Sequence, residues 1–195
     1  AQAMRGLSER FPDSLEGALK LSAIGNSLDF FIEDEYDISN FFFSGDVDKI
    51  KEEVYTKSKD VLILGDNIGD FVFDRKLIEY LQREGKTVYY AVKEHPVQND
   101  LSIQDVMKYN FKKIFGNIIS TGTDEVGIKR QDMIGKVKSL WESDGIVIAK
   151  GMGNYETLSE NEHQRSVIHI MKVKCIPVGA SVQKDKGTYI ALHRR

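Results

Sequence analysis

Polar side chains that could do chemistry follow three short apolar runs of the sequence. Asp66 and Asn67 follow the run Val61–Leu64 after a single glycine, Asp124 follows a second run, and Lys150 ends a third. Short apolar runs bounded by glycine-bearing turns are typical of buried parallel strands. Because open parallel sheets bind ligands at the carboxyl ends of their strands, we predict that these side chains share one edge of a sheet.

The residue types at these strand ends indicate phosphoryl chemistry. Two carboxylates and an amide oxygen, from Asp66, Asp124 and Asn67, form a hard-oxygen set that suits Mg²⁺ or Mn²⁺. Such a cation polarises a phosphoryl group and orients an attacking water. Lys150 fits as a point charge that holds the phosphate. Phosphoryl-group hydrolysis is the chemistry that uses all three strand ends.

Each of these positions also has a purely structural interpretation. Asp66 could simply cap the helix that follows it, because Asp and Asn are favoured N-caps. Asp124 could belong to an ordinary turn stabilised by Asp, Ser or Thr side chains. The glycine-rich residues 150–156 could form a plain strand-to-helix turn, and Asn26 with Asp29 could be a polar pair at a helix end.

Composition narrows the range of partners. With 195 residues, 41% of them hydrophobic, the chain can form one sizeable core and a small appended part. A net charge of -3 and a pI near 5.9 argue against a nucleic-acid partner. No apolar run approaches the roughly 18 residues that cross a bilayer, so we expect no membrane partner. The single cysteine, Cys175, suits a reducing cytoplasm, which is the expected location.

Other catalytic chemistries lack their motifs. The four histidines are scattered along the chain: His95, His163, His169 and His193. None has the H-E-x-x-H spacing of a zinc site, and no G-x-S-x-G elbow supports a serine nucleophile. An aspartyl nucleophile of the Asp-x-Asp type would need a carboxylate at position 68, which is Ile68.

Hydrophobic periodicity predicts alternating helices and strands. Helices are expected over residues 7–31, with a start signal at 12–14, and over 47–58, 71–83, 101–109 and 131–141. Strands are expected at 61–64, 87–92, within 114–120, and at 145–149, 168–175 and 188–192, the last of them at an edge. Residues 33–48, acidic and then aromatic, are interpreted as a loop.

Four motifs together resemble one protein family. They are residues 25–29 (GNSLD), 65–70 (GDNIGD) with Asp74 downstream, 122–124 (GTD) and 150–156 (KGMGNYE). Their types and order resemble the metal-dependent damage-control phosphatases, formerly catalogued as a domain of unknown function, number eighty-nine. The form of the last motif is similar to the archaeal and bacterial branch. The resemblance runs from about residue 15 to the end of the chain.

This resemblance implies a fold and an activity. It implies a three-layer α/β/α fold with a mainly parallel sheet, preceded by a helical N-terminal part. We therefore expect a helical part at residues 1–58 and the α/β phosphatase domain at 59–195. The branch usually carries a Cys-x-x-Cys pair in a longer helical region, so residues 1–58 are expected to be incomplete. The implied activity is divalent-metal-dependent removal of phosphate from small phosphorylated metabolites, such as sugar phosphates, with Co²⁺ or Ni²⁺ as further candidate metals.

The resemblance also assigns roles to residues by position. Asp66, Asn67 and Asp124 are the implied metal ligands, and together with Lys150, the implied phosphate contact, they form the expected catalytic set. The substrate-binding candidates are Asn26, Gly151, Gly153 and Asn154. At the last position of the second motif the family usually has Glu, where this chain has Asp70.

Two alternative functions remain open at this point. The family has a branch described as carboxyl methyltransferases, which would use S-adenosylmethionine. That chemistry predicts a Gly-x-Gly-x-Gly loop after the first strand, which residues 65–69 do not supply. The second alternative is a metabolite-binding module without catalysis.

Overall fold

The computed structural model of the protein describes residues 10–26, 41–160 and 165–194. Residues 27–29 of the first motif, with Asp29, and the acidic segment 33–40 lie outside these ranges. Within them, the expected helices and strands are present, most with ends shifted by up to four residues. The helix expected from residue 7 begins at Leu15, because the start signal at 12–14 supplies its N-cap, Ser14.

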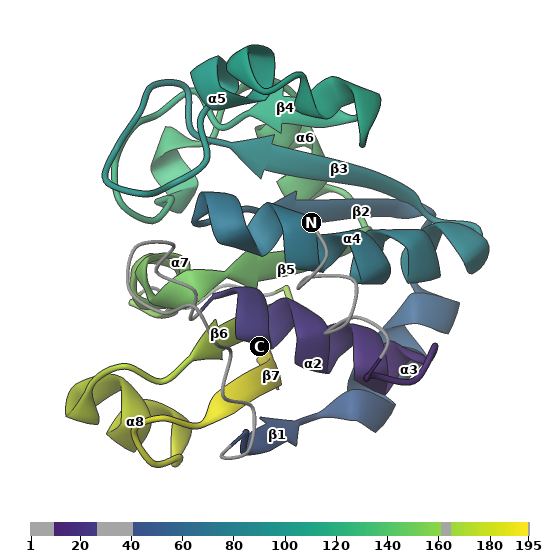
Figure 1. The fold of residues 1–195 in the computed structure, drawn as a ribbon, viewed down its shortest axis with the longest axis vertical. Coiled ribbons are helices and arrows are strands. Elements are labelled where there is room, and N and C mark those ends of the chain that lie inside the picture. The colour runs from purple at the N-terminus through teal and green to yellow at the C-terminus, as the bar shows by residue number, and fades with distance from the viewer. Residues whose placement is uncertain (1–9, 27–40, 161–164, 195) are drawn as a thin grey trace.

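The described strands form one seven-stranded sheet in the order β1-β7-β6-β5-β2-β3-β4 (Figure 1). Their bounds are β1 Phe43–Gly45, β2 Asp60–Leu64, β3 Thr87–Val92, β4 Ile118–Ser120, β5 Ile146–Lys150, β6 Val167–Lys172 and β7 Tyr189–Arg194. Every neighbouring pair is parallel except β6 and β7. The sheet is therefore mainly parallel, as predicted.

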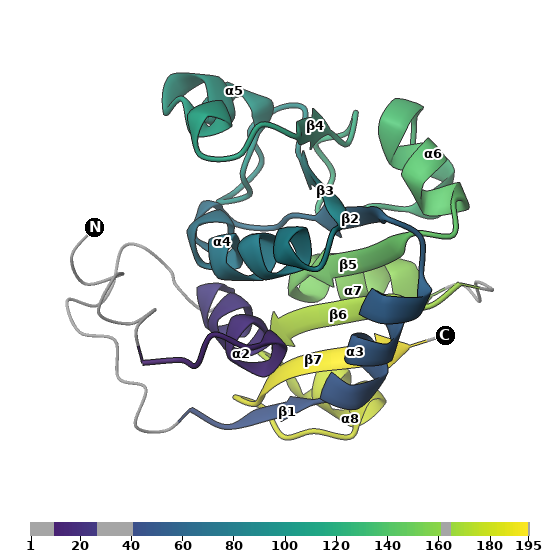
Figure 2. The same cartoon turned by 90° about the vertical axis from the view of Figure 1, so that its right-hand side faces the viewer.

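Helices cover both faces of this sheet, which completes the predicted α/β/α layers (Figure 2). One face carries α2 Leu15–Gly25, α3 Val47–Thr56, α4 Ile68–Arg83 and α5 Ile103–Lys108. The other carries α6 Gly135–Glu142, α7 Gly151–Ser159 and α8 Ile176–Val182; α7 and α8 were not among the predicted helices. Two short 3₁₀ turns, η1 Phe111–Lys113 and η2 Arg130–Asp132, lie in the connections.

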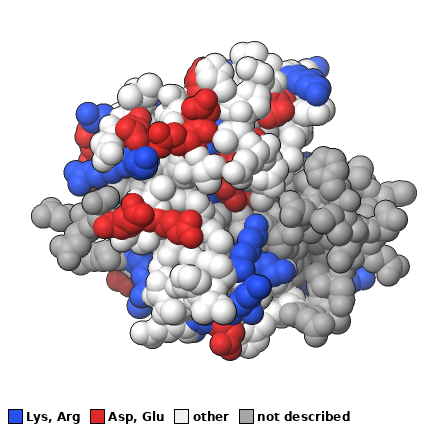
Figure 3. Space-filling model, turned by 90° about the vertical axis from the view of Figure 1, so that its left-hand side faces the viewer, with Lys and Arg blue, Asp and Glu red and all other residues white. Residues whose placement is uncertain are grey.

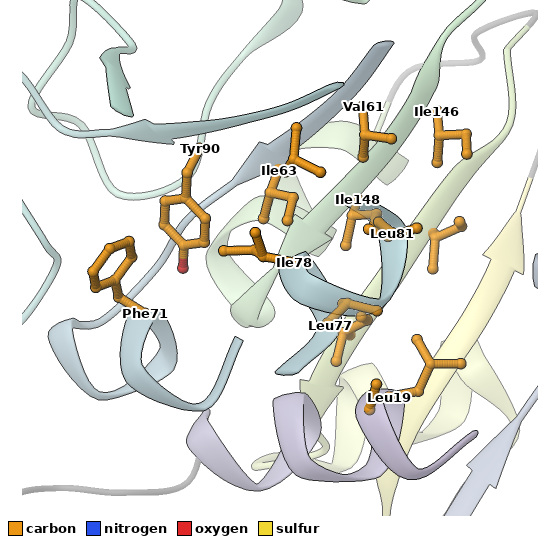
Figure 4. Close-up of a cluster of buried hydrophobic side chains, with 14 of the residues drawn as sticks. Leu19, Val61, Ile63, Phe71, Leu77, Ile78, Leu81, Tyr90, Ile146 and Ile148 are labelled. Atoms are coloured by element: carbon orange, nitrogen blue, oxygen red, sulfur yellow. The ribbon is translucent and has the colours of Figure 1, made fainter. Parts of the chain in front are cut away.

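Strand β2 shows why the apolar runs are continuous. Val61 and Ile63 face the layer of α2 and α4, whereas Leu62 and Leu64 face α6 and α7. Successive side chains of a strand point to opposite faces, so a strand covered on both faces needs apolar residues at every position. Figure 4 shows Val61 and Ile63 packed with side chains of α2 and α4.

Two details at one end of the sheet differ from prediction. Residues 43–45, interpreted as part of a loop, form the edge strand β1, and the strand predicted for that edge, β7, lies between β1 and β6. Three residues are too few for an alternating pattern to be recognised. A strand's place in a sheet also depends on its partners, not on its own sequence.

The domain boundary expected at residue 58 stays a prediction. The elements before it share the sheet and the core, because β1 pairs with β7, and α2 and α3 contribute to the same hydrophobic cluster as β2 and α4. Among the described helices, none combines the length and the apolar character needed to cross a membrane.

Candidate active site

The predicted meeting of strand ends at one edge is confirmed. Strands β2, β3, β4 and β5 run parallel, so the residues that follow them lie at the same edge. Asp66 follows β2 and Asp124 follows β4, with β3 between them. Neighbouring strands are about 4.8 Å apart, which puts these two strand ends roughly 10 Å apart. The Asp124 side chain is exposed. Joint coordination of one metal by both residues stays a prediction.

Asp66 lies against the start of α7. Its carboxylate accepts a hydrogen bond from Asn26 Nδ2 at 2.8 Å. Gly151, the first residue of α7, has φ +77°, and a Cβ there would lie 2.1 Å from Asp66 Oδ2. Only glycine therefore allows this close approach. The positive end of the helix dipole favours a carboxylate at this place.

The residue that caps α4 is Asn67, not Asp66. Asn67 Oδ1 accepts from the Asp70 backbone N–H at 2.9 Å, and the Asn67 N–H donates to Asp70 Oδ2 at 3.3 Å, which makes a capping box. Capping therefore does not account for Asp66. Asn67 uses its carbonyl oxygen in the cap, and its role as a metal ligand stays a prediction.

Lys150 is fully buried among oxygen atoms. Its Nζ donates to the backbone oxygen and the Oγ of Ser22, both at 2.8 Å, and to Asp74 Oδ1 at 2.7 Å. It also lies 2.9 Å from Asp70 Oδ1. The side chain is 0% exposed. Its predicted phosphate contact remains a prediction, and the ammonium group's present partners are all internal.

Hydrogen bonds connect these groups into one buried cluster. Asn26 Nδ2 bridges Asp66 and Asp70, lying 3.2 Å from Asp70 Oδ2, and its Oδ1 accepts from the Lys172 backbone N–H at 3.2 Å. At the far end, Tyr90 Oη donates to Asp74 Oδ2 at 2.8 Å. Asn26 thus joins the end of α2 to the strand-end carboxylates.

Two charged residues at this edge, Asp100 and Lys93, were not identified as site residues from the sequence. Asp100 pairs with Asn67 in an isolated β-bridge and is 8% exposed. Its carboxyl group is within hydrogen-bonding reach of Asp66. Lys93 Nζ lies 3.6 Å from Asp100 Oδ2. Lys93 directly follows β3, so the strand-end rule that selected Lys150 could have found it; Asp100 follows a proline-bearing loop without periodicity.

Burial and crowding shift the titration of these carboxyls. Burial, together with the nearby charge of Asp100, raises the pKa of Asp66 to about 6. Burial raises the pKa of Asp70 to about 7, against the opposing effect of Lys150. Burial alone would lower the pKa of Lys150, but Asp70 and Asp74 raise it above its usual value. The carboxyls outnumber the ammonium groups that neutralise them.

We expect the metal-free chain to lose stability as the pH rises. The pKa values of Asp66 and Asp70 are above their unfolded values, so the folded state binds more protons and its advantage is lost as pH passes through about 6 to 7. The expected loss between pH 5 and pH 8 is on the order of 3 kcal/mol. Urea unfolding with chelator measures it, and Asp70→Asn should flatten the slope. Stability that is constant or rising over this interval would contradict the assignment.

Other residues of the glycine-rich segment 150–156 connect α7 to the end of β2 and to the Asp124 loop. Asn154 Nδ2 donates to the Lys150 carbonyl at 2.8 Å and to the Gly65 carbonyl at 3.2 Å, which ties α7 to the end of β2. A Cβ at Gly153 would lie 3.0 Å from Val126 Cγ1, so the Asp124 loop packs closely on α7. The substrate contacts expected of Asn154 and Gly153 stay predictions.

The donor chemistry fits a divalent cation only in part. Within the described ranges, no three His, Cys, Asp or Glu side chains gather in a group that could hold a metal ion. Asp66, which is partly exposed, and Asp100, which is buried, instead offer a carboxylate pair. Mg²⁺ typically binds through one or two carboxylates, and waters and substrate phosphate oxygens complete its shell. The residues therefore fit a cation of this hard, water-retaining kind.

The same edge carries lysines beside the carboxylates. Lys174, which is exposed, lies close enough to Asp66 for its charge to lower the pKa of that carboxyl. Further lysines lie in the connection between β6 and β7: Lys184 and Lys186. Viewed from this side, Lys and Arg side chains form a band in the lower centre, and most of the Asp and Glu side chains in view lie above it (Figure 3).

A groove lies at the α8 end of this edge. The groove has a volume of about 460 Å³ and its lining includes Phe42, Ile176, Lys184 and Lys186. None of the buried charges described above lines it. The chemistry of the strand ends and this groove are therefore separate features.

Comparisons with known proteins identify relatives. A family model described as "Damage-control phosphatase ARMT1-like domain" matches residues 1–190. The damage-control phosphatase PH1575 of Pyrococcus horikoshii is 32% identical over 190 residues, which cover 92% of this chain and 65% of the relative. A damage-control phosphatase of Archaeoglobus fulgidus is 25% identical over 191 residues, again 92% of this chain and 65% of the relative. The chain thus spans less than two thirds of the length of these curated relatives.

The fold has a solved counterpart. The crystal structure of a DUF89 family protein (ph1575) from Pyrococcus horikoshii superposes with a TM-score of 0.84 at 29% identity. The match covers 99% of this chain and 70% of that chain. The α/β/α arrangement described above is thus shared with a crystal structure of that family.

Proposed function

Because the chain belongs to the damage-control phosphatase family with an ARMT1-like domain, we propose that it hydrolyses phosphate esters of small metabolites with a divalent metal ion. Mg²⁺ or Mn²⁺ is the proposed metal, and Co²⁺ and Ni²⁺ are alternatives. Sugar phosphates and related monoesters are the proposed substrates. The names of the relatives support phosphatase activity, and the charges at the strand ends support the metal.

The observation that carries this proposal is an excess of negative charge at this edge, where Asp70, Asp74 and Asp100 are buried and Asp66 is partly exposed. Four carboxyls cluster at the carboxyl edge, whereas two buried lysines lie among them. The carboxyls are Asp66, Asp70, Asp74 and Asp100, and the lysines are Lys93 and Lys150. Fully ionised, this set carries two uncompensated negative charges, and buried charges are costly unless paired. A divalent cation supplies the missing two positive charges.

In this proposal each residue has a defined task. Asp66, with Asn67 and Asp124, holds the cation, which when bound supplies Lewis-acid polarisation of the phosphoryl group. Asn26 orients the Asp66 carboxylate through its 2.8 Å hydrogen bond. Lys150 neutralises Asp70 and Asp74 beneath the site. Because Asp66 is partly exposed, substrate and water can reach its outer side.

Lys174 is the exposed cation best placed to hold the phosphate. We expect Lys174→Ala to raise KM for a phosphate ester about tenfold, because a hydrogen bond to a charged group contributes roughly 1.5–3 kcal/mol and solvent weakens it here. Steady-state kinetics at saturating Mn²⁺ measure this change. Lys186→Ala, an exposed lysine of the same edge, should leave KM within twofold. An equal KM for both variants and the unaltered chain would remove Lys174 from the site.

A panel of phosphate esters tests the function itself. The 195-residue chain is assayed for phosphate release with Mg²⁺, Mn²⁺, Co²⁺ or Ni²⁺, and with chelator. We expect hydrolysis of one or more sugar phosphates with at least one metal and none with chelator. Tight ester binding without turnover would favour a metabolite-binding module, and activity unchanged by chelator would refute the metal.

A further inference from the structure

Lys93 connects the two segments that carry the predicted metal ligands. Its Nζ donates to the backbone carbonyls of Glu125 at 2.7 Å and of Gly127 at 3.1 Å. On its other side the same ammonium group lies 3.6 Å from Asp100 Oδ2. The side chain is 3% exposed. All the partners of this buried cation are therefore internal, and they come from two different parts of the chain.

One of these parts carries Asp66. Asp100 pairs with Asn67 in a β-bridge, and the backbone N–H that follows, Leu101 N–H, donates to the Asp66 carbonyl at 2.8 Å. The end of β2 and the segment around Asp100 are thus joined by the backbone. A change in the position of Asp100 therefore also changes the position of Asp66.

The other part carries Asp124. The carbonyls that accept from Lys93 belong to the residue after Asp124 and to Gly127. On the N-terminal side of Asp124, the Glu94 N–H donates to the Thr123 carbonyl at 3.0 Å. The loop is thus fixed on both sides of Asp124 by adjacent residues that follow β3. β4 is the last strand at this end of the described sheet, so no further strand supports the loop from its outer side.

From these contacts we propose that Lys93 is a positioning residue: it holds the Asp124 loop against the Asp66 segment so that both carboxylates serve one divalent cation. The inference rests on the proposed function for the identity of that cation. Neutral hydrogen bonds could hold a loop, but Lys93 also offsets part of the negative charge of Asp100, which a neutral donor could not do.

The test compares Lys93→Met with a matched control, Lys86→Met. Lys86 immediately precedes β3, is 9% exposed, and donates to the carbonyls of Lys57 at 2.9 Å and Ser58 at 3.1 Å. Both lysines are thus buried at ends of the same strand and each bonds two backbone carbonyls. Lys86 is at the opposite edge, so its replacement reproduces the loss of a buried lysine without affecting the site.

Mn²⁺ titration calorimetry gives the first readout. Removing a partner that orients metal ligands typically costs ten- to hundredfold in metal affinity. We expect Lys93→Met to raise the Kd for Mn²⁺ at least tenfold and Lys86→Met to leave it within twofold. If Lys93→Met does not fold, Lys93→Gln, which keeps an N–H donor but no charge, should raise Kd at least fivefold. An unchanged Kd in the Lys93 variant, or an equal rise in both variants, would overturn the proposal.

Hydrogen–deuterium exchange gives the second readout and needs no metal. Peptides covering residues 121–128 should exchange at least tenfold faster in Lys93→Met than in the unaltered chain, and at an unaltered rate in Lys86→Met. If exchange does not change, Lys93 does not hold the loop and the proposal fails. If the unaltered chain binds no divalent metal, the proposed function fails instead, and exchange alone decides whether Lys93 fixes the loop.

Discussion

Asp66→Asn is expected to lower the rate of phosphate-ester hydrolysis about a thousandfold or more, while the chain stays folded. The substitution keeps the size of the side chain and removes its charge. A bound divalent cation contributes several kcal/mol of transition-state stabilisation, and losing that amount corresponds to rates lower by three orders of magnitude. Because α4 is capped by Asn67, the loss of the Asp66 charge leaves the cap intact.

Two measurements separate a loss of chemistry from a loss of folding. Phosphate release at saturating Mn²⁺ gives the rate, and a thermal melt with chelator gives the stability. The metal-free variant should be as stable as the unaltered chain or more so, because the pKa of Asp66 is raised by burial and the charged form is disfavoured there. Asp185→Asn, an exposed carboxylate in the connection before β7, should keep full activity. Activity of Asp66→Asn within twofold of the unaltered chain would end its proposed role.

Lys150→Met is expected to destabilise the chain by about 3–5 kcal/mol, the usual cost of leaving a buried charge without its partner. The ammonium group lies 2.9 Å from Asp70 and 2.7 Å from Asp74, and all three side chains are 0% exposed. Without it the two carboxyls would face each other and a dehydrated environment. For a chain of this size the change corresponds to a fall in Tm of about 10 °C.

A double-mutant cycle with Asp74→Asn identifies the cause. If the loss comes from the unpaired carboxylates, Lys150→Met should cost at least 1 kcal/mol less in the Asp74→Asn background, since residues that share a charge network couple by about 0.5–3 kcal/mol. Urea unfolding with chelator measures all four chains without contribution from metal. A loss below 1 kcal/mol for Lys150→Met, or a cost that is the same in both backgrounds, would show that the ion pairs do not stabilise this core.

The sequence by itself determined the layers of this protein. Continuous apolar runs such as Val61–Leu64 indicated strands covered on both faces, and the helical spacing between them indicated crossover helices. Ser14, within the predicted start signal, is the N-cap of α2. The motifs around Asp66 and Lys150 pointed to the family. These features are local, because each depends on residues within one turn or one strand.

Only the tertiary structure decided which charges meet. Both Lys93 and Lys150 follow strands, and the sequence does not show that their ammonium groups turn inward to bind groups far along the chain. Nor does it show that Asp100 lies beside Asp66. Such contacts depend on the order of strands and the path of the loops. Periodicity shows which face of its own helix or strand a residue occupies, but it does not show which other element packs against that face.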